Sequence, residues 1–167
     1  MISGALQGST FSLFCAVLLS SFFALVLTVV QLPQWLFYFW PDWIALIIVY
    51  WALMVPHRIG PLIGFIIGTL LEVLFVRKFG VLGFGLATLA FIVNTTHRQL
   101  RALSVWQQMV LVGLFIAIFK LLTGWLYGLV SDFTITSEYW YSILGGLLVW
   151  PFIFILLEEL RRKFRVR

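Results

Sequence analysis

Long apolar runs separated by short polar segments dominate this chain. About 20 consecutive apolar residues are enough for an α-helix to cross the hydrocarbon core of a membrane. The runs are continuous instead of alternating, which disfavours a β-barrel. The pattern predicts an all-α integral membrane protein, a single domain over residues 1–167 that forms a bundle of six transmembrane helices. The predicted spans cover residues 11–30, 43–55, 61–76, 80–93, 106–130 and 139–157, and the polar residues 94–103 are expected to form a loop.

The second predicted span is short for a bilayer. It follows an aromatic segment at residues 35–40, and aromatic side chains of this kind are typical of the membrane interface. We expect either that the span includes part of this segment or that it lies in a locally thinned bilayer.

The composition supports the same class. Hydrophobic residues make up 63% of the chain and charged residues 10%, whereas a soluble domain carries about a quarter charged residues. A net charge of +5 would suggest nucleic acid as a partner of a soluble protein, but here the basic residues lie in loops and at the C-terminus. We therefore expect membrane lipids, and no nucleic acid, to be the partners of these charges.

The positions of lysine and arginine predict an orientation. With six spans, both termini and two of the loops share one side of the membrane. Cytoplasmic loops carry the excess of basic residues, so both termini are expected in the cytoplasm. The basic residues on that side are Arg58, Arg98, Arg101, Arg161, Arg162, Lys163, Arg165 and Arg167, against Arg77 and Lys78 on the other.

Gly64, Gly68 and Glu72 are spaced four residues apart, so an α-helix places them on one face. The face is either a groove that a partner helix approaches closely or a contact between small residues inside the bundle, and the second is favoured for the glycines. A carboxylate inside a span is costly unless it is paired, protonated or near the interface. Functional and structural interpretations of Glu72 therefore both stay open.

Lys120 is a basic residue within an apolar run, which makes it a functional candidate that needs a partner. We predict an ion pair between Glu72 and Lys120, which would join the third and fifth spans. The alternative is a lysine whose ammonium group reaches the interface or a water-filled crevice.

A tight turn at Pro56, His57 and Arg58 separates the second and third spans, and it either determines topology or binds a lipid phosphate or a cytoplasmic partner. Trp150 and Pro151 lie within the sixth span, where the proline is expected to kink the helix. No catalytic or metal-binding motif is evident. We therefore predict a protein that is not an enzyme and has no cofactor.

Several short motifs resemble, in order and spacing, the MreD family of rod shape-determining proteins of Gram-negative bacteria. The motifs are Pro41-Asp42-Trp43, Tyr50-Trp51, Pro56-His57-Arg58, Gly60, Gly64-Phe65, Gly68, Gly80-Val81-Leu82-Gly83, Leu103, Trp106-Gln107-Gln108 and Trp150-Pro151.

This resemblance implies a non-enzymatic inner-membrane scaffold of the cell-elongation complex, which supports peptidoglycan synthesis and rod shape. The implied partners are MreC and, in a larger complex, MreB, RodZ, RodA and its penicillin-binding transpeptidase. The implied fold is similar to the membrane subunits of energy-coupling-factor transporters, and the glycine-lined face is expected to receive the single span of MreC. Glu72 stands where the family commonly has aspartate, and Lys120 stands at a position that is acidic in some relatives. The alternative function is a transporter subunit that binds a small molecule or lipid near these two charges.

Overall fold

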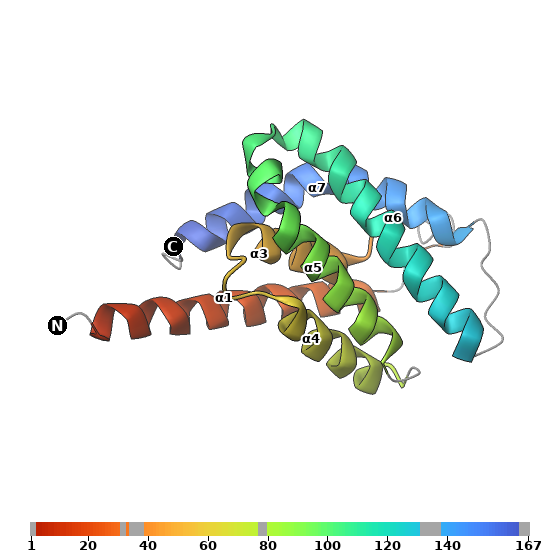
Figure 1. The fold of residues 1–167 in the computed structure, drawn as a ribbon, viewed down its shortest axis with the longest axis horizontal. Coiled ribbons are helices and arrows are strands. Elements are labelled where there is room, and N and C mark those ends of the chain that lie inside the picture. The colour runs from red at the N-terminus through yellow and green to blue at the C-terminus, as the bar shows by residue number, and fades with distance from the viewer. Residues whose placement is uncertain (1–2, 31–32, 34–38, 77–79, 131–137, 164–167) are drawn as a thin grey trace.

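The computed structural model describes residues 3–30, 33, 39–76, 80–130 and 138–163, with side chains from residue 12 onward and from residue 139 in the last helix. Within these residues the secondary structure consists of six α-helices and no strand (Figure 1). They are α1 (Ser3–Val29), α3 (Trp43–Met54), α4 (Pro61–Leu74), α5 (Val81–Ala102), α6 (Val105–Val130) and α7 (Glu138–Lys163). The prediction of an all-α protein is confirmed for this part of the chain.

The main difference from the predicted elements lies in α5. The sequence predicts a loop over residues 94–103, but the helix continues to Ala102. The buried residues Leu86, Val93 and Leu100 recur every seven positions, so one apolar stripe follows the helix to its end. The polar side chains of this last part lie on the other faces, where they do not interrupt the packing.

Helix α3 lies at the centre of the fold. All nine residues from Ala45 to Leu53 are buried, and α1, α5 and α7 pack around the helix (Figure 1). A helix that is apolar on every face is stable only where protein or lipid surrounds it. With 12 residues α3 is about 18 Å long, which is shorter than a bilayer is thick. Because its neighbours cover it, α3 does not have to match the thickness of the surrounding lipid.

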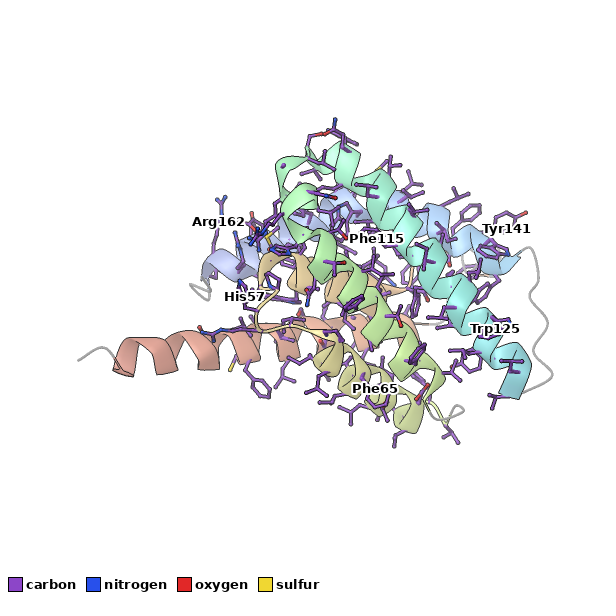
Figure 2. The ribbon with its side chains drawn as sticks, viewed as in Figure 1. His57, Phe65, Phe115, Trp125, Tyr141 and Arg162 are labelled. Carbon is purple, nitrogen blue, oxygen red and sulfur yellow. The ribbon has the colours of Figure 1, made fainter. Side chains whose placement is uncertain are left out.

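Consecutive helices run in opposite directions along the bundle (Figure 1). The start of α1, the α3–α4 turn, the end of α5 and the end of α7 therefore lie at one end. Figure 2 shows His57 and Arg162 at this basic end, and Trp125 and Tyr141 at the other. The turn that carries His57 and the end of α7 that carries Arg162 thus share one end of the bundle, whereas Lys120 is buried within α6. The side of the membrane on which the basic end lies stays a prediction.

Three of the described helices are long and apolar enough to cross a membrane. The spans are Ser12–Val29 within α1, Val105–Val130 and Tyr139–Lys163, while α3 and α4 are shorter apolar helices. The structure thus agrees with a helical membrane protein, and the six-span topology remains a prediction. The predicted aromatic segment lies mostly outside the described residues, as do Arg77, Lys78, Arg165 and Arg167.

Candidate functional site

The face that carries Gly64 and Gly68 is covered by α5. A methyl group placed on Gly64 would lie 2.7 Å from the carbonyl oxygen of Leu86, and one on Gly68 would lie 2.5 Å from Cα of Gly83. Real side chains do not approach backbone atoms this closely, so only glycine fits at both positions. This pair of helices is a close contact of the small-residue type inside the molecule. The expectation that this face receives a partner helix is therefore wrong, because α5 already occupies it.

Glu72 extends the same contact. Its side chain is fully buried; Oε2 accepts a hydrogen bond of 2.6 Å from the amide of Gly80, and Oε1 accepts one from the amide of Leu82. These amides lie at the start of α5, where N–H groups have no partner within the helix and the helix dipole favours a negative charge. Gly80 has a φ of +91°, a conformation that glycine adopts without strain. Glu72 therefore has a structural role: its carboxylate connects α4 to the first turn of α5.

Lys120 is paired with Asp42 and not with Glu72. Its Nζ lies 3.0 Å from Oδ2 of Asp42 and 4.1 Å from the centre of the Tyr139 ring. The Tyr139 hydroxyl in turn donates to the carbonyl oxygen of Lys120 at 3.1 Å. The predicted Glu72–Lys120 pair is wrong because α5 packs against both α4 and α6 and separates them. Lys120 instead joins α6 to the residue that precedes α3 and to the first turn of α7.

Polar side chains of α5 hold the turn between α3 and α4. The Arg101 guanidinium donates to the carbonyl oxygens of Leu53, at 2.9 and 2.6 Å, and of Met54, at 2.6 Å. The last carbonyls of a helix lack partners within it, and a cation at this end is favoured by the helix dipole. Asn94 Nδ2 donates to the carbonyl oxygens of Pro56, at 3.3 Å, and Ile59, at 3.1 Å.

The other predicted site residues are placed as follows. His57 is exposed in this turn, and Arg58 is half-buried beside it. Trp150 is fully buried in the core, and its Nε1 has no hydrogen-bond partner. Pro151 lies inside α7, which continues on both sides of it, and the kink expected there stays a prediction. The turn residues and the Trp150-Pro151 pair are therefore not brought together.

A further polar contact, which the sequence does not predict, joins α3 to α7. The Tyr50 hydroxyl donates to Glu158 Oε2 at 3.0 Å, and Arg161 donates to Glu158 Oε1 at 2.6 Å. Gln108 likewise holds the α5–α6 turn, because its Nε2 donates to the carbonyl oxygens of Leu100 and Leu103. The sequence carries no signal for the contact of Tyr50 with Glu158, whereas the heptad spacing of apolar residues continues through residues 94–102 and indicates that α5 extends there.

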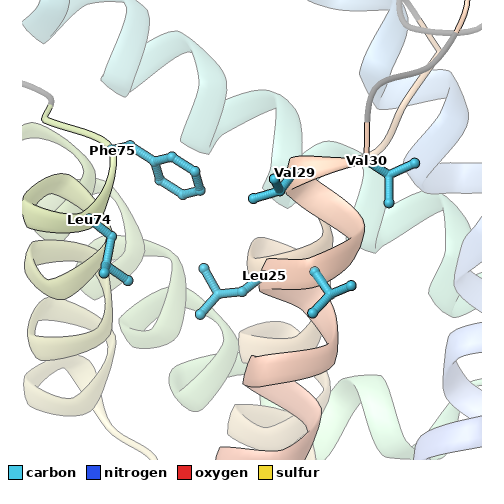
Figure 3. A pocket seen from close by; sticks show the side chains of 6 residues that line it. Leu25, Val29, Val30, Leu74 and Phe75 are labelled. Carbon is cyan, nitrogen blue, oxygen red and sulfur yellow. The ribbon is translucent and has the colours of Figure 1, made fainter.

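A groove separates the C-terminal ends of α1 and α4 (Figure 3). Its volume is about 530 Å³, and every lining residue is apolar: Leu25, Val26, Val29, Val30, Leu74 and Phe75. Figure 3 shows Leu25 and Val29 on α1 facing Leu74 and Phe75 across the gap. Among the described residues, this groove combines an apolar lining with room for side chains from another molecule.

The fold and these contacts define a helical membrane protein in which short polar contacts hold the helix ends together. The family model for the rod shape-determining protein MreD matches residues 9–160. The chain is 30% identical over 131 residues to the rod shape-determining protein MreD of Haemophilus influenzae, which covers 75% of this chain and 78% of that protein. The chain belongs to the MreD family. No solved structure matches it, so the expected likeness to energy-coupling-factor transporter subunits stays a prediction.

Proposed function

We propose that this protein is a non-enzymatic scaffold of the cell-elongation complex in the bacterial inner membrane. It would bind MreC and, through the larger complex, act with MreB, RodZ, RodA and the penicillin-binding transpeptidase to support peptidoglycan synthesis and rod shape. The observation that carries the proposal is the family match over nearly the whole chain. A role in rod-shape determination follows from membership of the family.

The six-span topology with both termini in the cytoplasm is part of this proposal. Its support is the alternating direction of the described helices, which brings His57 and Arg162 to one end (Figures 1 and 2). An excess of basic residues is typical of cytoplasmic loops. Labelling of single cysteines by a membrane-impermeant reagent tests it: a cysteine at His57 should react only after the membrane is opened.

The partner-binding surface proposed here is the groove between α1 and α4. The glycine face cannot serve, since α5 covers it. Helices associate in lipid mainly through close packing, and a partner can fill a groove that lipid fills poorly. We place bulky side chains of the MreC span in this groove, against Val29 and Leu74 (Figure 3).

Co-purification tests this function. Tagged wild-type protein should retain MreC in mild detergent at a constant ratio. Val29→Trp, which fills the groove, should lower the amount of MreC severalfold, while Leu148→Trp, at a similarly exposed position on α7, should not. Absence of MreC from the wild-type preparation would contradict the scaffold function, and equal retention by both variants would contradict only the groove.

The alternative function, a transporter subunit that binds a small molecule near Glu72 and Lys120, loses its proposed site. The two charges do not face a common space: Glu72 accepts from α5 amides, and Lys120 contacts Asp42 and Tyr139. The scaffold is therefore the function that this geometry supports better.

A further inference from the structure

One face of α4 is apolar and is not covered by any described helix. Leu62, Ile66, Leu70 and Val73 are exposed there, while the opposite face packs on α5. In a membrane, this exposed face meets lipid. The helix has 14 residues and is therefore about 21 Å long. The hydrocarbon core of a typical bilayer is about 30 Å thick, so α4 is too short to match it.

The neighbouring helix does not make up the difference. The apolar part of α5 begins at Val81 and ends at Val93, a length of about 20 Å. It is followed by Asn94, which bonds to the α3–α4 turn, and by the exposed residues Thr95 and Arg98. The surface formed by α4 and α5, called the α4–α5 flank below, is therefore apolar over only about 20 Å along its helices.

The other helices differ in this respect. α6 and α7 have 26 residues each, about 39 Å, and both are apolar over a length that crosses a normal bilayer. Leu148 on α7 is exposed along such a span. α3 is shorter than α4, but other helices surround it. The mismatch between protein and bilayer is thus confined to one side of the molecule.

Charge at the helix ends fits the same arrangement. His57 and Arg98 are exposed at the basic end of the flank, within or close to the turn that precedes α4. Exposed basic side chains at this level favour lipid phosphates over acyl chains. Phosphates that contact them would bring the headgroup layer closer to the centre of the bilayer on this side.

We infer that the α4–α5 flank is a lipid-interaction surface that fits a thinned bilayer and selects phospholipids with short acyl chains. A helix shorter than the local hydrocarbon thickness is accommodated by thinning of the bilayer, at a cost that rises with each ångström of mismatch. Short-chain lipids lower that cost, so they gather beside α4. Lipids beside α7 experience no such selection.

Fluorescence quenching in vesicles tests this inference with the full-length purified chain. In a Cys15→Ser background, a fluorophore is attached to Ile66→Cys on α4 or to Leu148→Cys on α7, both exposed. The vesicles contain equal amounts of fourteen-carbon and eighteen-carbon phosphatidylcholine, with bromine on one or on the other. Leu70→Cys and Leu144→Cys are second positions on the same two helices.

We expect the brominated short-chain lipid to quench the α4 positions about twofold more strongly than the brominated long-chain lipid. The α7 positions should be quenched equally by the two lipids or more by the longer one. Equal quenching by both lipids at Ile66 and Leu70 overturns the inference. Weak quenching by both lipids at the α4 positions alone also overturns it, because a second copy of the chain would then cover the face.

Discussion

Nζ of Lys120 lies 3.0 Å from Oδ2 of Asp42, and this pair connects α6 to the residue that precedes the central helix α3. The lysine is buried, whereas the aspartate is about two-fifths exposed. Partial exposure screens the pair, so its contribution to stability is moderate.

A double-mutant cycle measures this pair. Lys120→Met and Asp42→Asn should each destabilise the protein, and the double variant should lose about 1 kcal/mol less than the sum of the single losses. Lys120→Met combined with Glu72→Gln should give additive losses, because Glu72 has different partners. Unfolding in mixed detergent provides the free energies. Coupling between Lys120 and Glu72 in place of Asp42 would contradict the structure.

Replacement of Glu72 should weaken the junction of α4 with α5. Glu72→Ala leaves two half-buried amides without their acceptor and should cost about 2 kcal/mol of the free energy of unfolding. Glu72→Gln keeps one acceptor oxygen and should cost less. Glu159→Gln, at an exposed glutamate of α7, is the matched control and should have little effect. A loss at Glu159 as large as at Glu72 would argue against this role.

A methyl group at the α4–α5 contact should destabilise the fold. Gly64→Ala and Gly68→Ala place a carbon within 2.7 Å of the α5 backbone, and such overpacking costs about 1–3 kcal/mol. Gly60→Ala is the matched control, since its nearest neighbour, Asn94 Nδ2, would lie 3.8 Å away. The thermal unfolding midpoint in detergent is the measurement. Normal stability of the Gly64 and Gly68 variants together with loss of MreC would restore the partner-binding interpretation of this face.

Loss of the Arg101 side chain should loosen the α3–α4 turn. Arg101→Gln removes the cation that bonds to the Leu53 and Met54 carbonyls and should cost about 1–2 kcal/mol. Arg98→Gln removes an exposed charge from the same turn of α5 and should have a smaller effect. Protease cleavage at the α3–α4 turn of the solubilised protein provides a local measurement. Equal cleavage of the two variants would show that Arg101 does not hold the turn.

The sequence predicts the helical class well because continuous apolar runs have few physical outcomes. It also places Glu72 on the same helix face as Gly64 and Gly68, since that spacing depends only on local geometry. It does not predict which helices are neighbours, so it favours Glu72 as the partner of Lys120, whereas the structure pairs Lys120 with Asp42. The polar residues after Val93 favour a loop by composition, but the apolar heptad spacing continues to Leu100 and α5 continues with it.

The central claim, that this chain is a membrane scaffold for MreC, is tested most directly by photo-cross-linking in living cells. A photoreactive amino acid replaces Val29 in the groove between α1 and α4, or Leu148 on α7 as the control. The account predicts a cross-link to MreC from position 29 and none from position 148. Cross-links to MreC from position 148 alone, or from neither position, would contradict it.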